Sequence, residues 1–268
     1  MLAELIKIHT SDGLTHYGAY YTPPAGKAKP LGVVLVHGFT GHFVGEVESA
    51  LPLFLVQAGY TCLVVNNRGH GFAGAATEKF TGCLPDIQAA MDFIEERGYS
   101  YIALLGHSKG GVKVAYYLAQ RRDTRVKAIG LLSPSSTPHH LRFRPEMNRG
   151  PKKRQTFLVK IEKLVAEGKG DTILTMPYWP YYSSAAMLWD HVNMTGDDTL
   201  ENIRGAKLPI LAICGEKETD WCIPVMALHK NPPMGVTTVI VPGADHVYTG
   251  VEADLARIVI GWLNTIQI

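Results

Sequence analysis

A serine stands between two glycines in Gly106-His-Ser108-Lys-Gly110, directly after the apolar run 101–105 and before an amphipathic segment, 112–122. This order of strand, tight turn and helix predicts that the serine hydroxyl projects from the edge of a sheet. The flanking glycines fit such a turn, because a Cβ there would collide with neighbouring backbone. The adjoining helix N-terminus favours developing negative charge. We therefore predict that Ser108 is a nucleophile.

A serine nucleophile requires a base that accepts its proton. His246 follows Val241-Pro-Gly-Ala-Asp245, in a predicted loop between the last strand and the last helix. Because strands of a parallel sheet end at the same edge, this loop is expected beside Ser108. The sequence therefore predicts His246 as the base.

The base in turn requires a carboxylate that holds its tautomer and stabilises the imidazolium. Two acids follow the strand that ends at Cys214, namely Glu218 and Asp220. Counting forward from Gly215 favours Glu218, and counting back from Pro224, which opens the next helix, favours Asp220. Both assignments remain open on the sequence, and we favour Asp220.

Two backbone N–H groups are expected to stabilise a tetrahedral oxyanion. They are those of Lys109, after the nucleophile, and of Phe39, in the turn after His37-Gly38. The Lys109 side chain is expected to point to solvent or to the cap. His37 is expected to be a buried hydrogen-bonding strut rather than a base.

Buried strands alternate with helices over most of the chain. Strands are predicted at 5–8, 15–21, 31–36, 61–65, 101–106, 126–132, 208–214 and 237–241. Helices are predicted at 46–58, 85–97, 112–122, 156–166, 184–192, 224–228 and 251–266. Strands that are apolar on both faces indicate a mostly parallel sheet in a three-layer α/β domain. We assign 1–135 and 200–268 to this core domain, and 136–199 to a cap inserted over the sheet edge.

Together, these motifs resemble the α/β-hydrolase fold family of serine esterases and lipases over nearly the whole chain. The matching residues are His37-Gly38-Phe39, Asn67-Arg-Gly-His-Gly71, Gly106–Gly110, Gly215 with Asp220, and Gly243–His246. The resemblance implies an eight-stranded, mostly parallel sheet with a helical cap after strand six. Asn66 replaces the aspartate of the usual Asp-x-Arg-Gly-x-Gly, and the acid loop is about two residues longer than the common pattern.

Substrate contacts are expected just past the oxyanion turn and in the cap. The candidate lining residues are Thr40, His42, Tyr178, Trp179 and Tyr182, since aromatic walls with hydroxyl groups are typical of binding pockets. A basic run at 141–154 could attract an anionic substrate such as an acyl-CoA, but we favour a solvated lid face.

Composition limits the remaining function classes. Net charge is +2 in 268 residues, too balanced for a nucleic-acid partner. The N-terminal residues mix charges into their apolar run, so neither a signal peptide nor a spanning helix is expected. Four scattered cysteines fit reduced thiols in a soluble cytoplasmic protein. No motif indicates a metal or a cofactor.

From the sequence we expect a serine esterase that acts on a small or medium ester through an acyl-enzyme. A C–C hydrolase, an amidase or a thioesterase would share the same triad, and a non-catalytic ligand receptor would share the fold. Either a monomer or a homodimer is compatible with the sequence.

Overall fold

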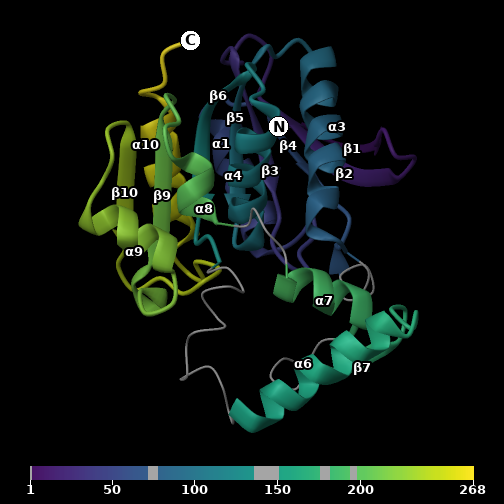
Figure 1. The fold of residues 1–268 in the computed structure, drawn as a ribbon. Helices are drawn as coiled ribbons and strands as arrows, with labels where there is room; N and C mark the ends of the chain where they lie inside the picture. Colours follow the sequence, from purple (N-terminus) through teal and green to yellow (C-terminus); the bar gives the residue numbers. More distant parts are fainter. Residues whose placement is uncertain (1, 72–77, 136–150, 176–181, 194–197) are drawn as a thin grey trace.

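The computed structural model describes residues 2–71, 78–135, 151–175, 182–193 and 198–268. An eight-stranded sheet forms its centre, in the order β1-β2-β4-β3-β5-β6-β9-β10 (Figure 1). The strands are β1 (Leu2–His9), β2 (Thr15–Thr22), β3 (Leu31–Val36), β4 (Cys62–Val65), β5 (Tyr101–His107), β6 (Val126–Leu132), β9 (Ile210–Gly215) and β10 (Val236–Val241). β2 pairs antiparallel with β1 and β4, and the other pairs are parallel. The predicted eight-stranded, mostly parallel α/β sheet is confirmed.

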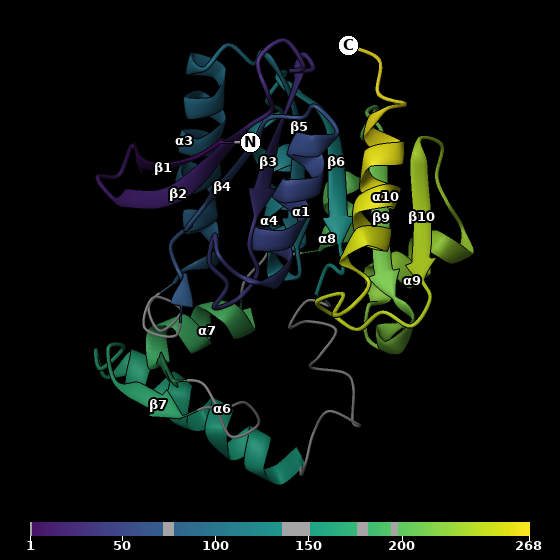
Figure 2. The same ribbon diagram turned by 180° about the vertical axis from the view of Figure 1, so that it is seen from behind.

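Helices cover both faces of the sheet, which gives the three layers (Figures 1 and 2). The helices of the main body are α1 (Glu46–Gln57), α3 (Cys83–Glu96), α4 (Lys109–Arg121), α8 (Thr199–Ile203), α9 (Ile223–Lys230) and α10 (Glu252–Leu263). α1 and α10 share one apolar cluster with one face of the sheet. α3, α4, α8 and α9 share a second cluster with the other face. Because both faces are covered, every residue of β3, β4 and β9 is buried, as their continuous apolar runs predict.

A segment between β6 and α8 lies beyond the end of the sheet, at the bottom of Figures 1 and 2. It contains α6 (Pro151–Ala166), β7 (Ile173–Thr175), β8 (Tyr182–Ser184) and α7 (Ala185–Asn193). Its apolar side chains form a third cluster, against which Phe39 of the main body packs. Asp190 of α7 also accepts a hydrogen bond from the backbone N–H of Phe80, at 2.9 Å. These contacts hold α7 against the same edge that carries the Phe39 turn.

Several local predictions differ from the structure. α4 begins at Lys109, three residues before the predicted start at Val112, because Ser108 itself is the N-cap residue. β7 and β8 form a small antiparallel sheet that the sequence pattern did not reveal, since each has only three residues. The short helix α8 was also missed.

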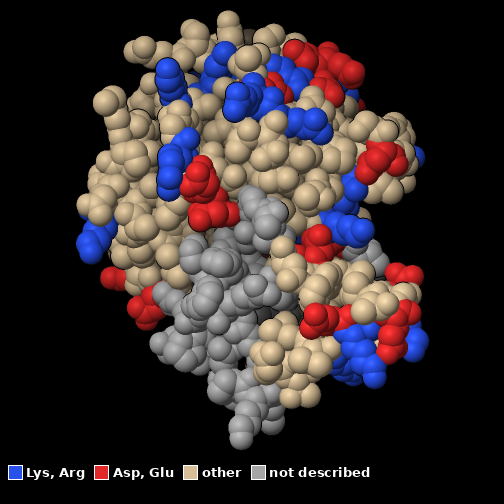
Figure 3. Space-filling view, in the orientation of Figure 1, with Lys and Arg blue, Asp and Glu red and all other residues tan. Residues whose placement is uncertain are grey.

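The surface and the helix lengths bear on possible partners. On the face in Figure 3, basic and acidic side chains of the described residues are interspersed, without a wide patch of one sign. Among the described residues, no helix has the length and apolar character that crossing a bilayer requires.

Candidate active site

The strand–turn–helix around Ser108 has the geometry that its glycines predict. Ser108 has φ +54°, a left-handed value that an L-residue adopts only when its surroundings hold it there. A Cβ on Gly106 would lie 2.3 Å from the backbone of Gly110, and a Cβ on Gly110 would lie 2.1 Å from the oxygen of Val36. Both positions therefore require glycine, and the turn projects the serine at the end of β5.

Ser108 and His246 meet as the sequence predicts. The Ser108 Oγ lies 2.9 Å from Nε2 of His246, in the loop after β10. On the other side of the ring, Nδ1 lies 2.7 Å from Oε2 of Glu218. Because the carboxylate can only accept, Nδ1 carries the proton and Nε2 is left to accept one from the serine hydroxyl. This tautomer is the one that a general base needs.

The preference for Asp220 as the acid partner is wrong, and the alternative, Glu218, occupies that position. Glu218 is buried in the short 3-10 helix η3 (Glu216–Glu218), which directly follows β9. Asp220 lies two residues further on, and its side chain is exposed. Counting back from Pro224 failed because α9 already begins at Ile223, after a turn that counting cannot reveal.

Hydrogen bonds fix the Glu218 carboxylate and keep it ionised. Its Oε1 accepts from the backbone N–H of Gly215 at 2.8 Å and from the hydroxyl of Ser133. The Ser133 Oγ also lies 2.7 Å from the hydroxyl of the buried Tyr248. Burial raises the pKa of Glu218, but the bonds from His246, Ser133 and Gly215 outweigh it, so the pKa lies below its ordinary value. Ser133 and Tyr248 are parts of the site that no sequence motif indicated.

The turn after β3 lies against the serine. A Cβ on Gly38 would lie 2.8 Å from Cβ and 3.2 Å from Oγ of Ser108, so only glycine allows this approach. Thr40 has φ +59°, and its hydroxyl donates to the oxygen of Phe39 at 2.6 Å. Lys109 is the first residue of α4, where a backbone N–H has no acceptor inside the helix. The two amides predicted as oxyanion donors therefore belong to segments that both adjoin Ser108.

The Lys109 side chain does not point to solvent, which was one of the two alternatives expected for it. The side chain is buried, and its ammonium group lies 3.0 Å from Oε2 of Glu78 and 5.3 Å from the centre of the Phe39 ring. A buried carboxylate 31 residues earlier in the chain holds it there, which sequence spacing does not reveal.

Hydrogen bonds of His37 and Asn66 hold the Phe39 turn in place. The Nδ1 of His37 donates to the oxygen of Gly38 at 2.8 Å, and its Nε2 accepts from the backbone N–H of Asn67 at 2.9 Å. Burial, with a smaller effect of Lys113, lowers the pKa of His37 to about 4, so the ring is neutral, as the strut prediction requires. Asn66 Oδ1 accepts from the backbone N–H of Phe43 at 2.8 Å. An aspartate oxygen would make the same bond, so this departure from the family pattern preserves the loop contact.

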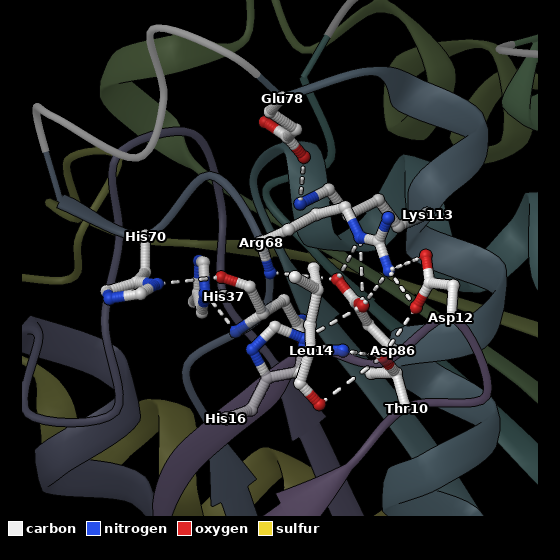
Figure 4. Close-up of polar contacts among 11 residues, drawn as sticks. Thr10, Asp12, Leu14, His16, His37, Arg68, His70, Glu78, Asp86 and Lys113 are labelled. Atoms are coloured by element: carbon white, nitrogen blue, oxygen red, sulfur yellow. Dashed lines mark hydrogen bonds and ion pairs between the residues drawn. The ribbon is translucent and has the colours of Figure 1, made fainter.

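The Asn67–Gly71 loop is anchored by an ionic network around Arg68 (Figure 4). The buried Asp86 accepts from the guanidinium and the backbone N–H of Arg68, and it lies 2.9 Å from Nε2 of His16. Arg68 also pairs with Asp12 at 2.8 Å. The next turn of this loop pairs with the oxyanion turn through a bridge between Thr40 and His70. The network therefore anchors a loop that is bridged to the Phe39 turn.

A second histidine–carboxylate pair lies beside His246. The Nε2 of His107 donates to the backbone oxygen of His246 at 2.8 Å, and its Nδ1 lies 3.5 Å from Oε1 of Glu48. Both side chains are buried. Burial lowers the pKa of His107, but Glu48 outweighs it and the pKa is raised. The Trp221 ring packs 4.8 Å from that of His246. No sequence motif indicates a role for His107, Glu48 or Trp221.

The structure places three of the five predicted substrate-contact residues, and their contact with a substrate stays a prediction. Thr40 lies beside Phe39, and the Nδ1 of His42 is buried near the same turn. Tyr182 lies on β8 and is 59% exposed. Tyr178 and Trp179 lie outside the described residues. Within the described residues, no group of three or more His, Cys, Asp or Glu side chains could hold a metal ion.

Comparisons with known proteins agree with this fold. A family model described as alpha/beta hydrolase fold matches residues 33–150. A Bacillus subtilis protein named as a 2-succinyl-6-hydroxy-2,4-cyclohexadiene-1-carboxylate synthase is 25% identical, over 90% of this chain and 91% of its own. A carboxylesterase of the same organism is 29% identical over 44% of this chain and 46% of its own. A solved carboxyl esterase from Bacillus coagulans superposes with a TM-score of 0.73 at 16% identity, covering 99% of each chain. The protein therefore has the α/β-hydrolase fold.

Proposed function

We propose that the protein is a serine hydrolase that cleaves a carboxylic ester of a small or medium substrate. The observation that carries the proposal is the continuous contact from Ser108 Oγ through His246 to the carboxylate of Glu218, at 2.9 and 2.7 Å. The esterases among the related sequences and solved structures support the same reaction class.

The reaction follows from these contacts. His246 accepts the proton of the Ser108 hydroxyl as Ser108 Oγ attacks the ester carbonyl. Glu218 stabilises the imidazolium that forms on His246. The backbone amides of Phe39 and Lys109 donate to the oxyanion. His246 then returns the proton to the leaving alcohol, and water activated by the same ring releases the acid from Ser108.

Labelling with a fluorophosphonate probe and hydrolysis of p-nitrophenyl esters of graded acyl length test the proposal. Wild type and the exposed control Ser11→Ala should label and turn over, whereas Ser108→Ala should do neither. Full activity of Ser108→Ala would overturn it. Absence of labelling would favour a ligand receptor, and labelling without ester turnover would favour an amide, thioester or C–C bond as the substrate.

A further inference from the structure

Two buried lysines share one buried carboxylate directly beside the nucleophile. The ammonium of Lys113, one helical turn after Lys109, lies 2.6 Å from Oε1 of Glu78 (Figure 4). The ammonium of Lys109 lies 3.0 Å from Oε2 of the same carboxylate. All three side chains are at most 5% exposed. Lysine and glutamate are seldom buried to this extent, so the cluster requires an explanation.

The cluster carries one positive charge in excess. Burial raises the pKa of Glu78, but the two lysines outweigh it and lower this pKa to about 2, so its carboxylate is ionised. For both lysines, burial lowers the pKa and Glu78 raises it. The pKa of Lys109 lies below its ordinary value, and the pKa of Lys113 lies above its ordinary value. By formal charge, two lysine side chains therefore face one carboxylate.

Nearby acids in the described part of the chain are committed to other partners. Asp86, which acts on Lys113 from a distance, is bonded to Arg68 and His16. Asp190 of α7 accepts from the backbone of Phe80.

The excess charge lies on the Phe39 side of Ser108. The Lys109 ammonium is 5.3 Å from the Phe39 ring, and the His191 ring of α7 lies 6.4 Å from that same ring. Burial, with the charge of Lys109, lowers the pKa of His191 to about 3, so this histidine is neutral and does not add to the cation. Its Nδ1 is buried without a hydrogen-bond partner among the described residues. An anion bound beside the Phe39 ring would thus lie near a cation and near a buried polar atom that has no hydrogen-bond partner among the described residues.

We propose that the substrate carries a carboxylate on its acyl part, and that this carboxylate pairs with the Lys109 ammonium when the ester carbonyl lies at Ser108. An unbalanced charge in a desolvated site is costly, and a substrate anion removes that cost on binding. Lys113 also pairs with Glu78, so this carboxylate keeps one cationic partner when the Lys109 ammonium group binds the substrate. This inference rests on the proposed esterase function and narrows its substrate class to half-esters of dicarboxylic acids.

Two other roles for the cluster predict different results. If the excess charge served only the oxyanion, its loss would lower turnover of charged and neutral esters by the same factor, because every ester forms that oxyanion. If the cluster were purely structural, its loss would change stability and leave selectivity unchanged. Selectivity between an anionic and a neutral ester of the same shape therefore distinguishes the three.

The experiment compares the monomethyl esters of succinic, glutaric and adipic acid with the matching neutral esters, in which the free carboxyl group is replaced by an amide. Hydrolysis of each ester is measured by pH-stat titration. Wild type should prefer the best acid over its amide by about tenfold or more in kcat/KM, as expected for a hydrogen bond between charged groups. Lys109→Met should bring this ratio close to one. Lys113→Met, which leaves the residue next to Ser108 unchanged, should also lower it. The control Lys217→Met removes an exposed lysine next to Glu218 and should leave the ratio at the wild-type value.

A wild-type ratio near one, or an equal loss on acid and amide in Lys113→Met, would overturn the proposal. In both cases neutral esters would still be cleaved, so the esterase function would stand. Failure of Ser108→Ala to abolish activity would instead overturn the esterase function itself. Should Lys109→Met not fold, the Lys113→Met ratio alone decides.

Discussion

The Nε2 of His107 donates to the backbone oxygen of His246 at 2.8 Å, while the neighbouring Ser108 Oγ lies 2.9 Å from the ring of the same histidine. His107 therefore contacts the main chain of His246, and Ser108 contacts its side chain, although His246 lies 138 positions after Ser108. Since a loop has few contacts of its own, this second bond holds the imidazole at the serine. The position of the His246 ring relative to Ser108 thus depends on the His107 side chain, which contacts neither Ser108 Oγ nor His246 Nε2.

Replacing His107 tests this positioning role. His107→Leu should lower kcat by about fivefold with little change in KM, since one hydrogen bond contributes about 1 kcal/mol. His107→Gln, whose amide nitrogen can replace Nε2, should recover most of the loss. Steady-state kinetics on a p-nitrophenyl ester measure both values. Equal kcat in the leucine and glutamine variants would show that the bond is not what matters.

Replacing the two acids of the loop after β9 separates Glu218 from Asp220. Glu218→Gln should lower kcat by about 10³-fold or more, because the amide no longer fixes the tautomer or stabilises the imidazolium. Asp220→Asn should retain nearly all activity. The measurement is kcat/KM for both variants, with circular dichroism to verify folding. A large loss in Asp220→Asn with an active Glu218→Gln would restore the original assignment.

The close approach at Gly106 predicts a strong and local effect on stability. Gly106→Ala should unfold at a much lower temperature or fail to fold, because its Cβ would lie 2.3 Å from the backbone of Gly110. Gly261→Ala, in α10, meets nothing within 4 Å and should be stabilising by up to about 1 kcal/mol. Thermal unfolding monitored by circular dichroism provides the comparison. A Gly106→Ala protein as stable as wild type would contradict the packing of this turn.

The Glu48–His107 pair predicts a pH-dependent contribution to stability. The folded pKa of His107 is raised above 6.5, so its contribution is complete below pH 6.5 and is lost as pH rises through the folded value. Burial raises the pKa of Glu48, but His107 outweighs this effect, and the pKa lies below 4.5. The contribution of Glu48 to stability is therefore complete above pH 4.5 and is lost as the pH falls through the folded pKa. The pair is therefore strongest between these two values.

Urea unfolding of wild type and Glu48→Gln measures this contribution. The wild type should be more stable than the variant by about 1–3 kcal/mol at pH 5.5, and the difference should shrink towards pH 9. The exposed pair Arg257–Asp254, removed by Asp254→Asn, is the control and should show little effect at either pH. A difference that grows between pH 5.5 and pH 9 would contradict the charged pair.

The sequence by itself determined the central sheet and two members of the proposed triad. Continuous apolar runs such as 31–36 and 101–106 can only be covered on both faces, which fixes buried parallel strands. The glycines at 106 and 110 then force one turn geometry on Ser108, and the loop after the last strand brings His246 to the same edge. These conclusions rest on local backbone rules, and local rules can be read from spacing.

Only the tertiary structure decided the carboxylate partner and the charges around the nucleophile. Glu218, and not Asp220, contacts His246, because Ser133 and the backbone N–H of Gly215 donate hydrogen bonds to its buried carboxylate. Lys109 turns inward because Glu78, from another loop, balances its charge below the surface. Side-chain partners that are distant in sequence meet only when the sheet is assembled, and burial and pairing energies then determine which of several similar residues occupies the site.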